Sequence, residues 1–459
     1  MNAPAPAALP AGLLLAYYGD DFTGSTDAME AMASAGIPTV LFLEPPTPDL
    51  LQRFPGVRCV GLAGSSRGRD TAWMEAELPA AFASLARLGA PVLQYKICST
   101  FDSSPTIGSI GKAIDLGTRA LGGRWAPMVV GAPRLKRYQL FGNLFAAVDG
   151  EGYRLDRHPT MARHPVTPMA EADLRVHLRQ QTARRIALVD MVQLQSGHGG
   201  ERVAAIAGDD TPVVLIDVLD EATLLAAGQL IWEGRGDGVF TASSSGLQYA
   251  LTAYWRKLGL IPPLPGLPAA QPAPVIAAVS GSCSPVTGAQ IGWAARHGFA
   301  TERLDVGRIL RDETNEAEIE RVVALACAAA RGGTSVVVYS ASGPEDPAVA
   351  GFETMARDAG LSRPVAARRV GAALAQVMRR MLDRTRLTRI VVAGGDSSGE
   401  VASALGISAL SVIAGMAPGA PLCRVWSRFA QRDGLEIVLK GGQIGDESFF
   451  GSVLAGNGG

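Results

Sequence analysis

The chain has 459 residues, 42 of them Lys or Arg and 43 Asp or Glu, so its formal net charge is −1. At roughly 100–200 residues per domain, this length predicts two or three domains. Hydrophobic residues make up 47% and charged residues 19%, which excludes a disordered chain. The balanced charge argues against a nucleic-acid-binding protein, because such proteins neutralise phosphates with many basic side chains.

We expect a cytoplasmic protein with no membrane association. No uncharged apolar run reaches the roughly 18–20 residues that span a bilayer. The leader at 1–12, MNAPAPAALPAG, has no basic region and is interpreted as a flexible tail, not a secretion signal. The five cysteines are scattered and odd in number. This pattern is typical of a reducing compartment and indicates neither a disulfide framework nor a zinc site.

Short apolar, β-branched runs alternate with longer amphipathic stretches along the chain, as in parallel sheets covered by helices. In the first half we predict strands at 13–18, 39–43, 57–62, 91–96, 128–131, 186–190, 213–218 and 238–241, and helices at 26–35, 70–88, 169–182 and 244–257. Segment 261–275, IPPLPGLPAAQPAPV, has six prolines and no charge, which predicts an extended linker. In the second half we predict strands at 275–279, 302–305, 335–339, 389–393 and 435–439, and helices at 286–297, 316–331, 371–384 and 399–406.

These elements predict an α/β protein with two domains, each a mainly parallel sheet flanked by helices, and an active-site cleft between them. The expected ranges are a tail at 1–12, an N-terminal domain at 13–260, a Pro-rich linker at 261–274 and a C-terminal domain at 275–459. Ligands of such sheets bind beyond the carboxyl ends of the strands. The loops that follow the strands are therefore the candidate sites.

An acidic loop, GDDFTGSTD at 19–27, follows the first predicted strand. Its spacing mimics a phosphate-binding Walker A loop, but the lysine is absent and the carboxylates of Asp20 and Asp21 would repel a bare phosphate. Carboxylates at a strand end could instead bind sugar hydroxyls, hold Mg²⁺ or accept a proton. The structural alternative is a helix N-cap, which explains one such residue but not the whole string.

Three basic loops follow other strands of the first half. They contain Arg67, the segment 96–100 (KICST) and the segment 133–137 (PRLKR). Arg can bind a carboxylate through two parallel hydrogen bonds, and Lys acts as a point charge. Singly, such residues are more often solvated surface charges. Together with the acidic loop they suit a small polyhydroxy anion.

A histidine follows in RHPVTPM at 163–169. His164 precedes a proline and is expected in a loop, with Thr167 capping a helix that Pro168 opens. His164 is either a structural hydrogen-bonding group or a ligand contact.

Three loops rich in glycine and hydroxyl groups follow strands of the second half. They are SGSCSP at 280–285, GGDSSG at 394–399 and KGGQIG at 440–445. Glycine lets backbone N–H groups approach a polyphosphate, and a helix N-terminus adds positive charge. No GxGxxG or GxxxxGK[ST] motif is present. Ordinary turns between strands and helices are the alternative.

In this order, the strings resemble the motifs of the four-carbon acid sugar kinase family. The matching segments are 19–27, 96–100, 137–142, 164–174, 280–284, 394–399 and 440–445. The resemblance spans nearly the whole chain. It implies an ATP-dependent kinase of sugar acids, with the acid bound by the N-terminal domain and ATP by the C-terminal domain.

The resemblance and the loop chemistry together give the expected site residues. Asp21 or Asp20 would orient or deprotonate the substrate hydroxyl. The expected substrate-binding residues are Arg67, Lys96, Ser99, Thr100, Arg137 and His164. The expected ATP-binding residues are Ser282, Gly394, Gly395, Asp396, Ser397, Ser398, Lys440, Gly441 and Gly442. Mg²⁺ would arrive with ATP, without a set of protein ligands.

Two positions depart from the tetronate kinases of that family. Cys98 stands where those kinases have Asp, and Asp102 where they have Arg. Segment 98–111, CSTFDSSPTIGSIG, is more similar to a branch found with RuBisCO-like proteins, the 3-oxo-isoapionate kinases. The expected substrate is thus an acid of the tetronate, 3-oxo-tetronate or 3-oxo-isoapionate type.

Two other classes of function stay open. One is an NAD(P)-dependent oxidoreductase of the same acids, against which the missing dinucleotide motif counts. The other is a non-catalytic sugar-acid-binding protein. The oligomeric state is also open, a homodimer included.

Overall fold

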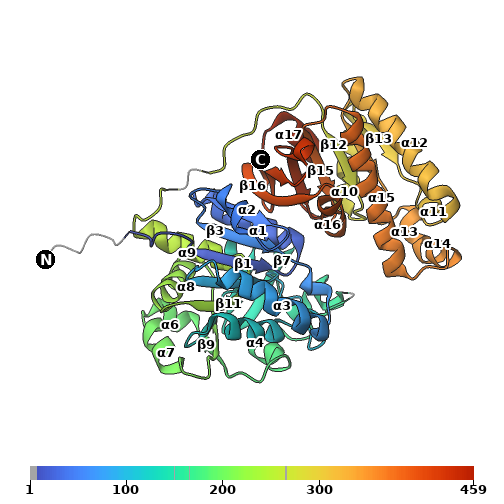
Figure 1. The fold of residues 1–459 in the computed structure, drawn as a ribbon. Helices are drawn as coiled ribbons and strands as arrows, with labels where there is room; N and C mark the ends of the chain where they lie inside the picture. Colours follow the sequence, from blue (N-terminus) through green and yellow to red (C-terminus); the bar gives the residue numbers. More distant parts are fainter. Residues whose placement is uncertain (1–7, 149, 165, 264–265, 459) are drawn as a thin grey trace. The chain divides into compact units, whose positions relative to one another are not determined.

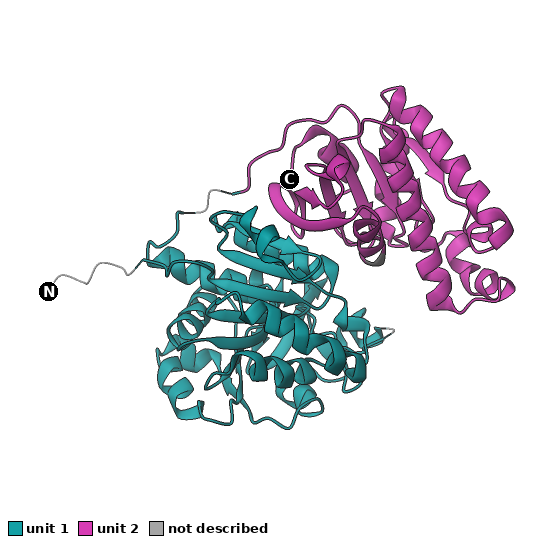
Figure 2. Cartoon of the chain, viewed as in Figure 1, with its two compact units in different colours: residues 1–266 teal, residues 267–459 magenta. Residues whose placement is uncertain are grey.

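The computed structural model describes residues 8–148, 150–164, 166–263 and 266–458, and of Asp396 only the backbone. The chain divides into two compact units, residues 1–266 and 267–459 (Figure 2). The division lies inside the proline-rich segment. Each unit is a mixed α/β structure in which helices flank a mainly parallel sheet (Figure 1), as the sequence predicts.

The main sheet of unit 1 runs in the order β11-β4-β1-β3-β2, and all neighbouring strands are parallel. Its strands are β1 (Leu15–Gly19), β2 (Thr39–Phe42), β3 (Cys59–Ala63), β4 (Val92–Lys96) and β11 (Val239–Ser243). Nearly all their residues are buried, which explains their continuous apolar runs. Gly19, Ala63, Lys96 and Ser243 end four of these strands in register. The loops that follow therefore leave the same edge.

Two smaller sheets complete the strands of unit 1. One is parallel, in the order β5 (Ala126–Met128), β10 (Val213–Ile216), β9 (Ile186–Val189). The other is an antiparallel meander of β6 (Arg137–Leu140), β7 (Asn143–Val148) and β8 (Glu151–Arg154). The meander was not predicted, and β5 begins two residues before the predicted strand at 128–131.

The helices of unit 1 are α1 (Phe22–Ser34), α2 (Pro48–Gln52), α3 (Thr71–Ala86), α4 (Ile110–Leu121), α5 (Leu174–Arg179), α6 (Met191–Gln195), α7 (Gly199–Ile206), α8 (Glu221–Glu233) and α9 (Gly246–Lys257). Helices lie near all four predicted positions, although α1 begins earlier and α5 is shorter than predicted, and the further helices α2, α4, α6, α7 and α8 were not predicted. Because α1 starts at Phe22, the acidic loop ends at Asp21, and the rest of the string lies in the helix.

The predicted helix at 169–182 is wrong over its first part. Helix α5 begins at Leu174, and Asp173 caps it by accepting a hydrogen bond from the Arg175 N–H at 2.9 Å. The preceding residues bond elsewhere: the Met169 N–H donates to the Met161 carbonyl, and the Ala172 carbonyl accepts from Leu144. Thr167 is therefore not a helix cap.

The sheet of unit 2 runs in the order β16-β17-β18-β15-β12-β14-β13. Its strands are β12 (Ala277–Ser280), β13 (Ala300–Arg303), β14 (Val336–Tyr339), β15 (Arg389–Ala393), β16 (Ile407–Ala417), β17 (Ala420–Ser427) and β18 (Glu436–Lys440). The strands from β18 to β13 are parallel, whereas β16 and β17 form an antiparallel hairpin. The hairpin was not predicted.

The helices of unit 2 are α10 (Pro285–Arg296), α11 (Val306–Ile309), α12 (Asp312–Arg331), α13 (Pro347–Ala350), α14 (Phe352–Asp358), α15 (Arg363–Arg384), α16 (Gly395–Ala404) and α17 (Phe449–Ala455). The end of the proline-rich segment packs on this unit, since the Ala270 and Ala273 N–H groups donate to carbonyls of Gly456 and Leu454. In the described part of the chain, no helix combines the length and apolar character needed to cross a membrane.

Candidate active site

Asp21 starts helix α1 and defines the turn after β1. Its Oδ1 accepts a hydrogen bond from the Gly24 N–H at 2.7 Å, and its backbone is extended, as N-caps require. The Ser25 hydroxyl donates to the Asp21 carbonyl at 2.6 Å. The capping interpretation is therefore right for Asp21, but it uses only one oxygen of the carboxylate.

Arg67, from the loop after β3, joins the two carboxylates. Its Nε and Nη2 donate to Oδ2 and Oδ1 of Asp20 at 3.1 and 2.7 Å, and its Nη1 donates to Oδ2 of Asp21 at 2.7 Å. A guanidinium has five N–H donors, so two remain for a substrate. Arg67 is placed with the acidic turn as expected, although most of its donors serve the protein.

Burial distinguishes the two carboxylates. The Asp20 side chain is 4% exposed and that of Asp21 30%. Burial raises the pKa of Asp20, while Arg67 opposes the shift. Burial alone would lower the pKa of Arg67, but Asp20 raises it well above its usual range. Asp21 is thus the carboxylate that a substrate can reach, and Asp20 holds Arg67.

Lys96 is the last residue of β4 and supplies a second cation. Its side chain is 3% exposed, and its Nζ lies 3.5 Å from Oδ2 of Asp27 on α1. A Cβ atom added to Gly24 would lie 3.0 Å from this Nζ and 3.5 Å from Nη2 of Arg67. The first turn of α1 is therefore bordered by both cations, and Gly24 leaves them room.

The loop after β4 carries a chain of polar side chains. The Thr100 hydroxyl donates to Oδ1 of Asp102 at 2.8 Å and lies 2.9 Å from the Cys98 Sγ. Burial, helped by the charge of Asp102, raises the pKa of Cys98 to about 11, although Arg67 opposes the shift. The thiol is therefore protonated at neutral pH. Ser99 is half-buried in the same loop.

Burial lowers the pKa of Arg137, whereas Cys98 and Asp102 raise it. Because these two residues influence its pKa, Arg137 must lie close to this loop. Its Nη1 donates to backbone carbonyls, and its buried Nε has no hydrogen-bond partner among the described residues. His164 is held in its own turn, where its Nδ1 accepts from the Thr167 N–H at 3.1 Å. No hydrogen bond in the described part of the chain joins His164 to the acidic turn.

Three loops of unit 2 converge after β12, β15 and β18, as expected from their sequences. A Cβ atom on Gly281 would lie 2.2 Å from the Ser397 Oγ, and one on Gly442 would lie 2.5 Å from the Ser282 Oγ. Gly394 has a φ of +122°, a conformation that other residues avoid. The glycines thus allow the three loops to pack closely against one another.

Helix α16 begins at Gly395, so most of the predicted glycine loop forms its first turn. Ser397 and Ser398 are buried there. The Ser398 hydroxyl donates to the Gly394 carbonyl at 2.8 Å, whereas the Asp396 side chain lies outside the described residues. Gly441 is half-buried next to Gly442.

Lys440, the last residue of β18, is fully buried. Its Nζ donates to the Thr287 hydroxyl at 3.2 Å and lies 5.5 Å from the centre of the Phe449 ring. Burial lowers its pKa to about 8. The Thr287 hydroxyl in turn donates to the Gly442 carbonyl at 2.7 Å. The protonated amine therefore places a positive charge next to the glycine loop, to which Thr287 connects it.

Several polar residues at these edges were not among the expected site residues. The Ser284 hydroxyl bonds the Gly442 carbonyl at 2.6 Å, which ties the first loop to the third. In unit 1, buried Asp217 accepts from the N–H groups of Phe141 and Gly142 and fixes the turn after β6. Ser245, before α9, has a buried hydroxyl with no hydrogen-bond partner among the residues that the structure describes. The serine triplet at 243–245 was the available signal for that residue.

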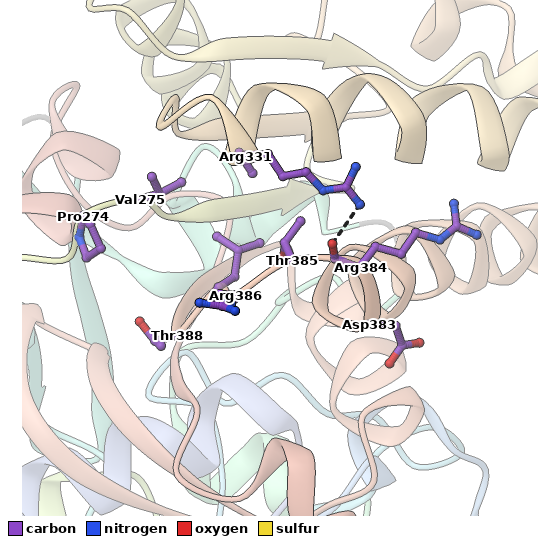
Figure 3. A pocket seen from close by; sticks show the side chains of 10 residues that line it. Pro274, Val275, Arg331, Asp383, Arg384, Thr385, Arg386 and Thr388 are labelled. Atoms are coloured by element: carbon purple, nitrogen blue, oxygen red, sulfur yellow. Dashed lines mark hydrogen bonds between the residues drawn. The ribbon is translucent and has the colours of Figure 1, made fainter.

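A cavity of about 570 Å³ lies elsewhere in unit 2 (Figure 3). It is lined by Pro274, Val275, Ala330, Arg331, Asp383, Arg384, Thr385, Arg386, Leu387 and Thr388. These residues precede β12 and β15 or end α12 and α15, so the cavity is at the edge opposite the glycine loops. Arg331 donates to the Arg384 carbonyl there at 2.9 Å. The cavity is not part of the candidate active site.

No cluster of three or more His, Cys, Asp or Glu side chains suited to a metal ion occurs in the described ranges. The polar groups at the two edges are instead carboxylates, cations, hydroxyls and backbone amides. This set can bind a small anionic polyol in unit 1 and phosphates in unit 2.

Comparison with protein families agrees with this division. Residues 15–251 match the model of a sugar-binding N-terminal domain, and residues 277–450 match that of a nucleotide-binding C-terminal domain. Together the two matches include both edges described above.

The chain is also similar to characterised proteins over nearly its whole length. It is 70% identical to a 3-oxo-isoapionate kinase of Paraburkholderia graminis, with 99% of this chain and 97% of that protein covered. It is 30% identical to a 3-oxo-tetronate kinase of Cupriavidus necator, with 97% and 98% covered. A solved structure from Salmonella typhimurium, described as a putative tRNA synthase, superimposes with a TM-score of 0.78 at 26% identity and covers 96% of this chain and 98% of its own.

Proposed function

Because the chain belongs to the four-carbon acid sugar kinase family and is a kinase, we propose that it transfers the γ-phosphoryl group of ATP to a terminal hydroxyl of 3-oxo-isoapionate. The choice of acid rests on the kinase of that name in Paraburkholderia graminis, at 70% identity. The 3-oxo-tetronate kinases are much more distant, at 30% identity or below.

One observation carries the proposal: a partly exposed carboxylate, Asp21, lies against the guanidinium of Arg67. Phosphoryl transfer depends on positioning and charge neutralisation more than on covalent catalysis. In this role Asp21 orients the substrate hydroxyl and accepts its proton. Asp20 stays buried and fixes the guanidinium, whose two spare N–H groups face the substrate or the transferring phosphoryl group.

The remaining contacts to the acid come from the neighbouring loops. Lys96 supplies a point charge for the carboxylate. Thr100 and Ser99 offer hydroxyls, and Arg137 offers a buried Nε–H that has no partner among the described residues. His164 has the weakest support, because its ring is already bonded to Thr167.

The nucleotide belongs in unit 2. The close packing of the three glycine loops at Gly281 and Gly442 supports a phosphate cradle there, and the N-terminus of α16 and Lys440 add positive charge. This cradle suits the phosphates of ADP or ATP, held by Ser282, the residues 394–398 and 440–442. Mg²⁺ would enter with the nucleotide and neutralise phosphate charge. We place the reaction in the cytoplasm, where ATP is abundant and free cysteines persist.

The test is a steady-state assay of ADP formation by the purified protein with Mg·ATP and one acceptor at a time. We expect 3-oxo-isoapionate to give a kcat/KM at least 10-fold above that of a 3-oxo-tetronate. Phosphorylated product, identified by mass spectrometry, must match the ADP formed. Equal or better use of the 3-oxo-tetronate would contradict the proposed acid, and ADP formation without acceptor dependence would contradict a sugar-acid kinase.

A further inference from the structure

The turn between β11 and α9 holds a buried hydroxyl that no part of the described structure uses. Ser245 is 1% exposed, and its Oγ has no hydrogen-bond partner in the described part of the chain. It precedes the 12-residue helix α9 but makes no capping bond. Buried hydroxyls are almost always paired, so an unpaired one indicates a missing partner.

The neighbouring serines show that this is not a general property of the turn. The Ser244 Oγ donates to the Val130 carbonyl at 2.8 Å and accepts from the Gly246 N–H at 3.0 Å. The Ser243 Oγ accepts from the Val129 N–H at 2.9 Å. Two hydroxyls thus attach the turn to the loop after β5, and the third is left for another group.

Lys96 lies at the same place. Ser243 and Lys96 are register partners at the ends of β11 and β4. Gln94 and Lys96 point to the same face of the sheet, because side chains alternate along a strand. The Gln94 Nε2 bonds the carbonyls of Ser243 and Ser244 at 2.9 and 3.0 Å. Lys96 lies two residues closer to the carboxyl end of β4, so its side chain lies next to the start of α9.

Helix α1 closes the other side of this region, since it packs against α9. Its Asp27 is the ion-pair partner of Lys96 at 3.5 Å. Tyr249, one turn into α9, lies under the guanidinium of Arg134, 5.8 Å from its ring centre. The elements around the Ser245 turn thus carry the cations Lys96 and Arg134 and the carboxylates Asp27 and Glu30, since Asp27, Arg134 and Glu30 all act on the pKa of Tyr249. The charges of these four side chains cancel, and the positive end of α9 tips the balance toward an anion.

We propose that Ser245, with the N-terminus of α9 and Lys96, binds the carboxylate of the sugar acid. The proposal deepens the proposed function and rests on it for the identity of the acid. It makes Ser245 a binding residue that acts before any phosphoryl transfer. The hydroxyl would donate its hydrogen bond to one carboxylate oxygen, and Lys96 would pair with the charge.

The test compares Ser245→Ala with Ser244→Ala. Steady-state kinetics give the KM of each variant for 3-oxo-isoapionate and for Mg·ATP, and thermal unfolding gives Tm. We expect Ser245→Ala to raise the KM for the acid at least 10-fold, with the KM for Mg·ATP within 2-fold and Tm unchanged or higher. Ser244→Ala should lower Tm, because it breaks two bonds, and should change the KM for the acid less than 3-fold.

Binding of D-erythronate and of its neutral alcohol, erythritol, separates this proposal from the proposed function. Calorimetry on the wild-type protein and Ser245→Ala needs no turnover, so it reports on the subsite even if 3-oxo-isoapionate is not the substrate. A loss of affinity for erythronate alone supports a carboxylate site. Unchanged affinity for erythronate, or an equal loss for both compounds, overturns it.

Discussion

Arg67 forms a two-point hydrogen-bonded pair with Asp20, from Nε to Oδ2 at 3.1 Å and from Nη2 to Oδ1 at 2.7 Å. The same guanidinium also donates to Asp21, whose side chain is the more exposed of the two carboxylates. One acidic residue therefore maintains the structure of the turn, while its neighbour is left for chemistry. Substitution of Asp20 should therefore affect mainly stability, and substitution of Asp21 mainly turnover.

For Asp20→Asn we expect mainly a loss of stability. An amide has one acceptor oxygen, and its NH₂ group would face the guanidinium, so Arg67 would lose its buried counter-charge. Removing one partner of a buried ion pair typically costs about 3–5 kcal/mol. Urea unfolding followed by circular dichroism measures the change. An unchanged free energy of unfolding would show that Asp20 does not hold Arg67.

For Asp21→Asn we expect mainly a loss of turnover. Asn caps a helix nearly as well as Asp, so Tm should stay within a few degrees of the wild-type value. Losing a proton acceptor typically lowers the rate by about 10²–10⁴-fold. The measurement is kcat at saturating acid and Mg·ATP. Near-normal kcat would remove Asp21 from the mechanism and leave its capping role as the whole explanation.

Lys440 should make ATP binding depend on pH. Its pKa of about 8 means that the amine is protonated at pH 7 and largely neutral above pH 9. The dissociation constant for ATP should therefore rise as the pH passes through 8. Calorimetry in buffers of different ionisation enthalpy should detect proton uptake on binding near pH 8. In Lys440→Met, ATP should bind weakly at every pH, without that uptake.

The same lysine should destabilise the ligand-free protein below pH 8. There both the folded and the unfolded state bind its proton, and the charge is buried at a cost of about 3 kcal/mol, the equivalent of lowering a pKa from 10.5 to about 8. Between pH 8 and 10.5 the unfolded state binds more protons, so the free energy of unfolding should rise with pH. Relative to Lys440→Met, the wild type should be less stable at pH 7 and recover most of that difference by pH 10. A constant difference would contradict this account.

The glycine cradle can be tested by adding one methyl group. In Gly281→Ala the new Cβ would meet the Ser397 Oγ at 2.2 Å, so the first and second loops must separate. We expect the KM for Mg·ATP to rise at least 10-fold, while the KM for the acid stays within 2-fold. Gly399→Ala is the matched control, because it lies in α16, where no described atom outside the backbone of the helix itself lies within 4 Å of the new Cβ, and it should leave both KM values unchanged. Equal effects of the two variants would contradict the cradle.

Much of the fold is predictable because buried parallel strands are continuous apolar runs. The segment VVLI of β10 is fully buried and was predicted from its composition. Helix α4 was missed because it contains Gly111 and Gly117, which lower helix propensity. The structure explains them: a Cβ atom on Gly117 would lie 1.9 Å from the Phe240 ring. Such close packing appears only once the two segments are placed together.

The candidate site was predictable as residue types but not as roles. The sequence places Asp20, Asp21 and Arg67 after adjacent strands, yet only the geometry separates the buried carboxylate from the accessible one. Ser245 could not be singled out from its neighbours, because all three serines of the triplet are buried. What distinguishes it is the absence of a partner for its hydroxyl within the described structure, and a sequence does not contain that information.

Strand β11 has a consequence for how the protein is made. The Gln94 side chain bonds the carbonyl of Ser243, 149 residues later in the chain, and β11 completes the sheet beside β4. During synthesis, Lys96 leaves the ribosome long before its neighbouring strand exists. Domains generally fold as units, from the N-terminus onward. The acidic turn can form early in a nascent chain, but the edge of the sheet that carries Lys96 and Ser245 stays incomplete until α9 has emerged. A chain halted before residue 239 would therefore carry Asp21 and Arg67 without the turn at 243–245.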